Sequence, residues 1–127
     1  MNRNLKLFGA FFGMTAVIIG AFGAHALAEV LSADSLKSFE TGVKYQMYHA
    51  LLMILLGFNA RTTSRIYQFI FYMLVFGVFF FSGSIYLLAT NTLTGFDFTS
   101  IALVTPFGGS LLIISWLLIL ISFWSKD

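Results

Sequence analysis

The chain has 127 residues; 59% of them are hydrophobic, 9% are charged, and the formal net charge is +2. A soluble globular domain has about a quarter of its residues charged, so this composition excludes a water-soluble protein and indicates one integral membrane domain. The chain has no cysteine, which excludes disulfides and cysteine-ligated metals, and its basic residues are scattered rather than clustered as in a nucleic-acid-binding protein.

The first predicted helix crosses the membrane with residues 7–27, inside an uncharged stretch that ends at Ala28. About 20 apolar residues span a hydrocarbon core of about 30 Å, and the stretch is too long for a signal peptide, so we expect a mature transmembrane helix. Small residues form a stripe on one helical face, namely Gly9, Gly13, Ala16, Gly20 and Gly23. Such a stripe predicts close helix packing inside the bundle, with a dimer surface as the alternative.

The second predicted span, residues 41–60, is unusual because polar side chains enter the membrane with it. Ser32 or Asp34 is expected to cap this helix before it reaches the membrane. Helical spacing places on one face Gly42, Tyr45, His49 and Met53, with Gln46 beside them and Thr41 at the start. With a rise of about 1.5 Å per residue, His49 would lie about 12 Å below the surface, whereas His25, at the end of the first span, would lie about 3 Å deep.

The third predicted span, residues 66–88, is rich in phenylalanine. We interpret these aromatic side chains as core packing and lipid contacts rather than as a cofactor site, and we expect Phe71 and Phe79 to face lipid. The span ends in small and polar residues that suit close interhelical contact, Phe81-Ser82-Gly83-Ser84-Ile85-Tyr86.

The fourth predicted span covers residues 105–124. Thr105 suits the N-cap of this helix and Pro106 its first helical position. The alternative is a helix that starts at Thr99 and is kinked at Pro106. Glycines that allow close helix packing are predicted in the later spans as well: Gly42, Gly83, Gly108 and Gly109.

The basic residues predict the orientation of the protein. Five of the seven lysine and arginine residues fall on one side of the four-span model: Arg3, Lys6, Arg61, Arg65 and Lys126. Because basic loop residues stay on the cytoplasmic side, both termini are expected in the cytoplasm, and the chain is expected to be a multi-pass protein of the plasma membrane.

Four motifs occur in order along the chain: Gly20-Ala21-Phe22-Gly23-Ala24-His25, Thr41-Gly42-Val43-Lys44-Tyr45-Gln46-Met47-Tyr48-His49-Ala50-Leu51, Phe81-Ser82-Gly83-Ser84-Ile85-Tyr86-Leu87 and Thr105-Pro106-Phe107-Gly108-Gly109. This arrangement resembles the YgdD/YwdK-like family of small bacterial membrane proteins. The resemblance covers nearly the whole chain and implies a four-helix integral membrane protein. It implies little about activity, because that family is a domain of unknown function.

In the four-span model the polar groups of all four helices lie in the half of the bundle away from the cytoplasm. They predict an intrabundle polar pocket around His49 that consists of His25, Thr41, Tyr45, Gln46, His49, Ser82, Ser84, Tyr86 and Thr105. Three roles for the histidines stay open: a structural hydrogen bond, which we favour, a proton-relay, quinone or small-ligand site, and metal or haem ligation. Ligation is the least favoured role because only two histidines and no intramembrane carboxylate are available.

We therefore predict an all-α integral membrane four-helix bundle with no metal and no cofactor. The favoured function is that of a non-enzymatic structural or accessory protein, since the sequence has no nucleophile–base, phosphate-loop or zinc motif. The expected partners are membrane lipids and, in addition, another membrane protein or a second copy of the chain, but no nucleic acid. The alternatives are a transporter or small-ligand carrier that uses the pocket around His49, and a quinone- or haem-binding subunit of a membrane enzyme.

Overall fold

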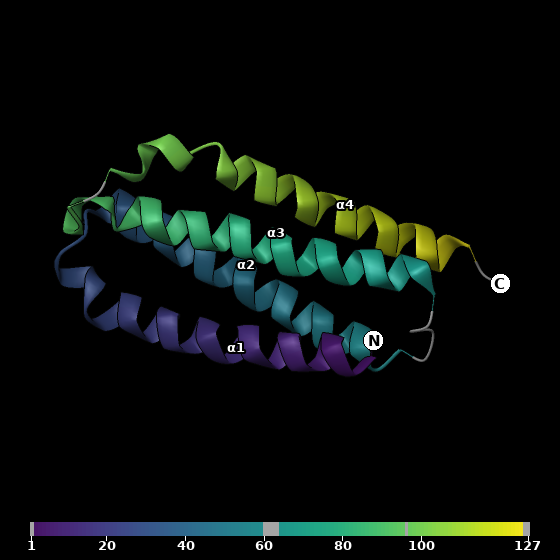
Figure 1. Ribbon diagram of the computed structural model, residues 1–127. Helices are drawn as coiled ribbons and strands as arrows, with labels where there is room; N and C mark the ends of the chain where they lie inside the picture. The colour runs from purple at the N-terminus through teal and green to yellow at the C-terminus, as the bar shows by residue number, and fades with distance from the viewer. Residues whose placement is uncertain (1, 60–63, 96, 126–127) are drawn as a thin grey trace.

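Four long helices dominate the computed structural model, which describes residues 2–59, 64–95 and 97–125. They are α1 (Asn2–His25), α2 (Ala33–Gly57), α3 (Arg65–Ala89) and α4 (Val104–Trp124). The short 3-10 helix η1 (Leu27–Glu29) follows α1, and η2 (Asn91–Leu93) and η3 (Phe98–Ile101) connect α3 to α4. The helices run alternately up and down, so that α1 begins and α4 ends at the same end of the molecule (Figure 1). The predicted all-α four-helix architecture is confirmed; Arg61 and Lys126, used to predict the orientation, lie outside the described residues.

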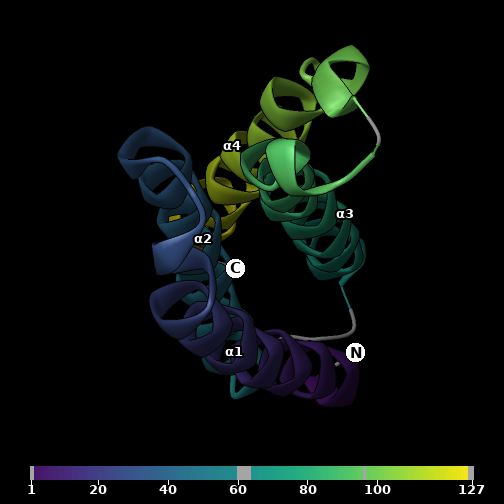
Figure 2. The same cartoon turned by 90° about the vertical axis from the view of Figure 1, so that its left-hand side faces the viewer.

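The bundle consists of two helical hairpins. The helix α1 packs along α2, α3 packs along α4, and the two hairpins meet chiefly where α2 packs on α3. The end-on view in Figure 2 shows α1 and α4 at opposite corners, with α2 and α3 between them. Each outer helix therefore keeps a broad face that no other helix covers.

The small-residue stripe of α1 faces α2. A Cβ atom added at Gly9 would lie 2.8 Å from the carbonyl oxygen of Ala50, and one added at Gly20 would lie 3.1 Å from a methyl group of Val43. An added Cβ at Gly13 would also meet Ala50, and one at Gly23 would meet the ring of Phe39 on α2. The stripe thus serves the contact between α1 and α2 inside one chain rather than a surface left free for a dimer.

The glycines of the second hairpin differ from one another. A Cβ at Gly108 would collide with the backbone of Phe81, so α4 crosses α3 at van der Waals contact there. Gly77, which the sequence did not single out, gives the same close approach to Leu112. Gly83 was expected to pack as well, but a Cβ there would meet no atom within 4 Å because this side of α3 borders a hollow between α1 and α3.

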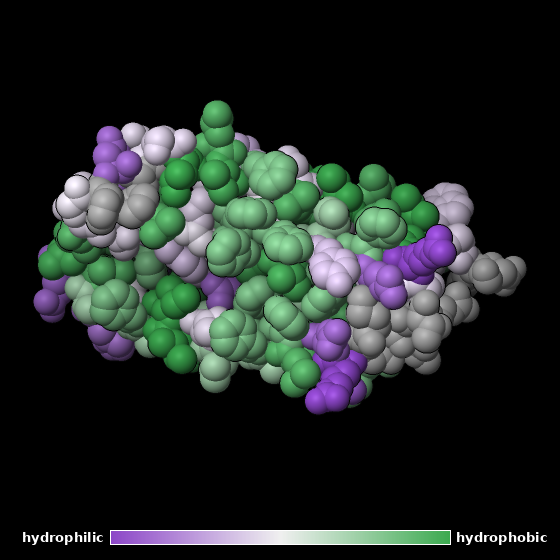
Figure 3. Space-filling model, in the orientation of Figure 1, coloured by the Kyte–Doolittle hydropathy of each residue, from purple (hydrophilic) through white to green (hydrophobic). Residues whose placement is uncertain are grey.

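Three stretches of the described residues are long and apolar enough to cross a membrane: Arg3–Glu29, Arg65–Ala89 and Thr99–Trp124. The helix α2 is not among them because its first half carries an exposed charged stripe, Asp34, Lys37, Glu40 and Lys44. This half begins at the predicted cap, since the Ser32 hydroxyl accepts a hydrogen bond of 3.2 Å from the Ser35 amide. A span of α2 from about Thr41 onward stays a prediction. Figure 3 shows hydrophobic residues over the middle of one face and hydrophilic ones gathered toward its two ends.

The start of α4 differs from both predicted alternatives. The helix begins at Val104 after the separate turn η3, and Leu103 occupies the N-cap without a side-chain hydrogen bond. The predicted capping role of Thr105 is wrong: its hydroxyl lies inside the first turn and forms a 2.6 Å hydrogen bond with Ser84 of α3. Pro106 is the third helical residue, a position whose missing N–H costs nothing because first-turn amides have no partner within the helix.

One of the two phenylalanines expected to face lipid is buried. Phe79 is 66% exposed, but Phe71 is only 5% exposed and joins the main apolar core with residues such as Met53, Ile70 and Leu74. The ring of Phe71 meets that of Phe8 on α1 edge to face, with the centroids 5.2 Å apart. The aromatic side chains of α3 therefore form part of the contact between the hairpins as well as the lipid surface.

Candidate functional site

Gln46 is the centre of a polar network that joins three helices. Its amide nitrogen donates to the Phe12 carbonyl at 2.9 Å and to the Thr15 hydroxyl at 2.7 Å, both on α1. Its amide oxygen accepts a 2.6 Å hydrogen bond from the Tyr86 hydroxyl of α3. The side chain is 4% exposed, so these contacts replace hydration that the apolar surroundings do not supply.

A second contact beside this network brings α3 onto α2. The buried Ser82 hydroxyl donates to the Gly42 carbonyl at 2.7 Å. A Cβ at Gly42 would lie 2.8 Å from the ring of Tyr86, so this position has no room for a larger residue. Since a helix carbonyl with two lone pairs can accept this additional bond, Ser82 holds α3 to the backbone of α2 itself.

His49 uses both of its ring nitrogens within the chain. Its Nδ1 lies 2.6 Å from the Tyr45 carbonyl, and its Nε2 lies 3.1 Å from Nε1 of Trp116 on α4. An indole nitrogen only donates, so Nε2 of His49 accepts; Nδ1 then carries the proton and donates to the carbonyl. The geometry describes a neutral imidazole with one defined tautomer that links α2 to α4.

Ser84 and Thr105 form a third and separate contact. Their hydroxyl oxygens are 2.6 Å apart, and Ser84 also donates to the Phe81 carbonyl at 3.0 Å. This contact joins α3 to the first turn of α4. Six of the nine residues predicted to form one pocket are thus divided among separate helix contacts rather than gathered around His49.

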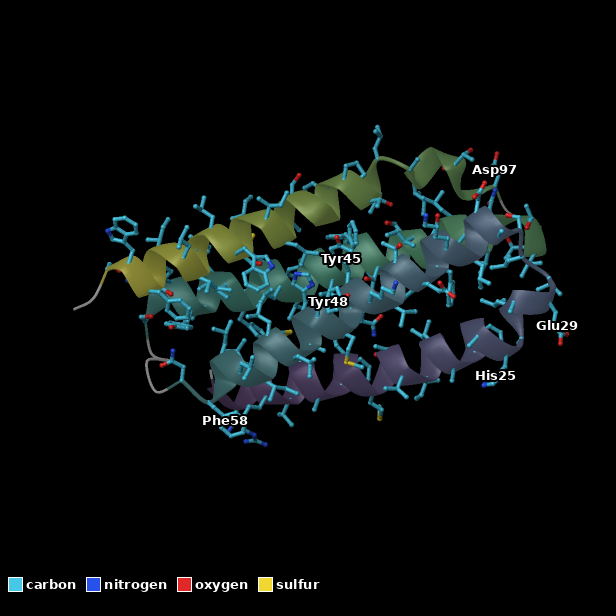
Figure 4. All side chains as sticks on the ribbon, turned by 180° about the vertical axis from the view of Figure 1, so that it is seen from behind. His25, Glu29, Tyr45, Tyr48, Phe58 and Asp97 are labelled. Carbon is cyan, nitrogen blue, oxygen red and sulfur yellow. The ribbon has the colours of Figure 1, made fainter. Side chains whose placement is uncertain are left out.

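The side chains of the other three residues form none of these interhelical hydrogen bonds. His25 is exposed at the end of α1 and projects away from the bundle, as Figure 4 shows. Thr41 donates to the Lys37 carbonyl of its own helix at 3.1 Å. Tyr45 is 42% exposed, so the buried stripe of α2 consists of Gly42, Gln46, His49 and Met53, with Gln46 in the place that the sequence pattern had given to Tyr45.

Sequence reasoning missed two members of the polar contacts, Thr15 and Trp116. Each is a hydrogen-bonding side chain within a mostly apolar helix, and Trp116 lies eight residues before Trp124, which marks the end of the predicted span. An indole N–H has no acceptor within its own helix and needs a partner elsewhere, which is the signal that would have found Trp116. A threonine hydroxyl can donate within its own helix, as that of Thr15 does to the Phe11 carbonyl at 3.0 Å, so the sequence carried no comparable signal for Thr15.

The buried polar side chains are used in contacts between helices. Within the described ranges, no three histidine, cysteine, aspartate or glutamate side chains are grouped so that they could hold a metal ion. The lone pair of His49 that would serve as a base or a ligand accepts from Trp116. What the buried polar groups do is hold helices against one another, both within a hairpin, as Gln46 does with α1, and between the hairpins, as Ser82 and His49 do.

Two hollows lie along α2 and α4, each with α3 contributing to its lining, and we call the two together the α2/α4 groove. Its outer hollow has a volume of ≈470 Å³ and is lined by Asp34, Ser35, Ser38, Ile85, Leu88, Ala89, Ala102, Thr105 and Pro106. Its inner hollow, of ≈280 Å³, is lined by Tyr45, His49, Phe81, Gly109, Leu112, Ile113 and Trp116. Figure 4 shows Tyr45 on the side of α2 toward α4.

A smaller hollow lies on another face, between α1 and α3. Its volume is ≈130 Å³, and the Gln46 network forms its floor together with apolar side chains such as Phe11 and Val78. Figure 3 shows a small hydrophilic patch between these two helices on an otherwise hydrophobic face. Because the amide of Gln46 is engaged by three partners, this hollow presents few free polar atoms.

Known sequences similar to this chain are membrane proteins. A family model described as "Protein of unknown function (DUF423)" matches residues 19–109. The UPF0382 membrane protein SSP2132 of Staphylococcus saprophyticus is 42% identical, over 91% of this chain and 92% of the relative. The UPF0382 membrane protein YwdK of Bacillus subtilis is 35% identical, over 91% and 92%, and the UPF0382 inner membrane protein YgdD of Escherichia coli is 35% identical, over 94% and 88%. No solved structure matches the chain.

Proposed function

This chain belongs to the UPF0382 family of membrane proteins, whose matching model is described as a protein of unknown function (DUF423), and we propose that it acts as a non-enzymatic structural or accessory protein of the cell membrane. The resemblance to the YgdD/YwdK-like family is confirmed. The proposed partners are membrane lipids and, on the uncovered faces of the outer helices, another membrane protein or a second copy.

The observation that carries this proposal is the engagement of His49. A proton relay needs a ring nitrogen that exchanges protons with water or substrate, and a haem or metal site needs a free lone pair on that ring. In this bundle Nδ1 donates to Tyr45 and Nε2 accepts from Trp116. Gln46 is engaged in the same way, so the polar stripe of α2 supports a structural role.

The proposal is tested by exchanging His49 for residues that keep or lose its hydrogen bonds. His49→Gln retains one donor and one acceptor, so we expect a melting temperature near that of the wild type and full complementation of a deletion-strain phenotype. His49→Leu leaves the Trp116 N–H without a partner, which costs about 1–3 kcal/mol, so its melting temperature and membrane level should fall.

The two readouts separate a structural from a chemical role. Melting temperature is measured on purified protein in detergent, and complementation is measured at matched protein levels in the membrane. A Gln variant that melts like the wild type but does not complement would contradict the proposal, because the imidazole itself would then be needed.

A further inference from the structure

We propose that the α2/α4 groove binds one membrane phospholipid whose headgroup carries a primary amine, with phosphatidylethanolamine as the representative. The headgroup would occupy the outer hollow and an acyl chain the inner one. This inference goes beyond the structural role proposed above and does not depend on it.

The two hollows lie one after the other along the same three helices. On α2 the lining passes from Asp34 to His49, and on α4 it passes from Ala102 to Trp116. Because α2 packs on α3 but not along α4, α3 forms the floor of both hollows. In the inner hollow the hydrogen bond between Trp116 and His49 connects the two walls.

The length of the groove matches one leaflet of a bilayer. From Asp34 to His49 the axis of α2 rises about 22 Å, at about 1.5 Å per residue. A bilayer with its headgroups is about 40–45 Å thick, so one leaflet is about 20–22 Å. A transmembrane helix of a partner would need a groove about twice as long, whereas a phospholipid of one leaflet fits this one.

The polarity of the groove changes along its length as that of a phospholipid does. The outer hollow combines the Asp34 carboxylate and two serine hydroxyls with apolar residues of α3. The inner hollow is lined by aromatic and aliphatic side chains and by the engaged His49 ring. The charged stripe of α2 ends at Lys44, between the two hollows, which places the outer one in the headgroup region and the inner one in hydrocarbon.

The negative charge in the lining of the outer hollow favours a phospholipid headgroup that carries an ammonium group. Among the described residues that line the outer hollow, Asp34 carries the charge, and its sign is negative. The ammonium group of phosphatidylethanolamine has an ionic partner there, whereas phosphatidylglycerol offers none. Asp34 is exposed, so the preference should be about two- to fivefold, the size that an ion pair in contact with water supports.

The experiment measures bound lipid on the full chain. The protein is reconstituted in nanodiscs of equimolar phosphatidylethanolamine and phosphatidylglycerol, extracted in mild detergent, and analysed by native mass spectrometry for the lipid that stays bound. The wild type should retain one phosphatidylethanolamine about two- to fivefold more often than phosphatidylglycerol.

Two variants and their matched controls locate the site. Asp34→Asn should remove the preference, while Glu29→Gln, an exposed acid at the same end of the bundle on η1, should keep it. Gly109→Leu should fill the inner hollow and reduce retention of both lipids, because a Cβ there meets the Phe81 ring at an ordinary 3.5 Å. Gly83→Leu adds the same bulk away from the groove and should retain lipid as the wild type does.

Three outcomes would overturn the inference. The first is that the wild type retains no more lipid than Gly109→Leu, and the second is that Asp34→Asn keeps the preference for phosphatidylethanolamine. The third is that a cross-link from a cysteine at Ser38 shows a protein partner or a second copy covering the groove. If Gly109→Leu does not fold, Ala102→Phe at an exposed position blocks the outer hollow instead. Bound lipid is measured without a cellular phenotype, so failure of this inference is distinguishable from failure of the proposed structural role.

Discussion

At the scale of single residues, four of the five buried polar side chains in the described ranges find partners on neighbouring helices, while Ser115 bonds within its own helix. Gln46 bonds to α1 and α3, His49 to α4, and Ser82 to the backbone of α2. Interhelical hydrogen bonds in membrane proteins contribute about 0.6 kcal/mol on average, but a polar atom left without its partner costs about 1–3 kcal/mol. The free energy lost when a buried polar atom is left without its partner is therefore larger than the free energy that each bond contributes to stability.

Gln46 gives the sharpest residue-scale prediction. Gln46→Leu removes three interhelical hydrogen bonds and leaves the Tyr86 hydroxyl without its acceptor, so we expect unfolding to become easier by about 1–3 kcal/mol. Tyr86→Phe removes one of these bonds and should cost less. The measurement is the free energy of unfolding in detergent micelles titrated with sodium dodecyl sulfate.

The control for this experiment is Ser122→Ala. The Ser122 hydroxyl bonds within its own helix, to the Ile119 carbonyl at 2.7 Å, so its loss should change the unfolding free energy little. If Gln46→Leu were no more destabilising than Ser122→Ala, the network would not hold the hairpins together.

At the scale of helices, glycines set how closely the elements approach. The stripe on α1 lets α2 lie against it, and Gly108 and Gly77 do the same for α3 and α4. Lipid tails are as apolar as leucine, so close van der Waals contact rather than the hydrophobic effect drives these pairs together. The same residue type on an open side of a helix, as at Gly83, has no such role.

Substitution of glycine by alanine should lower the stability of the protein at Gly108 and raise it at Gly83. Gly108→Ala forces a methyl group into the backbone of Phe81, and such overpacking costs about 1–3 kcal/mol. Gly83→Ala meets open space and should stabilise the helix by about 0.4–1 kcal/mol through its better helix propensity. Melting temperatures of the two purified variants, compared with the wild type, test both signs; a tolerated Gly108→Ala would show that α3 and α4 lie further apart.

At the scale of the whole molecule, the alternating helices place the start of α1 and the end of α4 on one side (Figure 1). The basic residues predict that this side is cytoplasmic. The outer hollow of the α2/α4 groove lies at the opposite end, next to Asp34 and Ala102. The proposed lipid would therefore come from the outer leaflet of the membrane.

The orientation is tested by labelling cysteines, which the natural chain lacks. Cysteines introduced singly at Ser35 and Asn91 should react with an impermeant thiol reagent on intact cells, because the first turn of α2 and the loop after α3 are predicted to face outward. A cysteine at Thr63, which lies outside the described residues, should react only after the membrane is permeabilised. Equal labelling at all three positions would contradict the predicted topology.

Sequence alone was sufficient for the all-α class and the four-helix architecture of this protein. Long apolar stretches with few charges require helices that satisfy their own backbone hydrogen bonds in lipid, and the described residues contain three such stretches together with the more polar helix α2. The small-residue stripe on α1 was also visible, because close packing in lipid depends on residue size, which a periodic pattern shows directly.

Only the tertiary structure decided which faces of the helices meet. Phe71 and Phe79 look alike in sequence, yet one is buried and the other faces outward, since an apolar side chain is equally compatible with lipid and with a neighbouring helix. Gln46 rather than Tyr45 joins the buried stripe, although the two are neighbours separated by about 100° around the helix. Helical periodicity relates residues within one helix, but the rotation of α2 against α1, α3 and α4 is fixed by the partners that Thr15, Tyr86 and Trp116 supply.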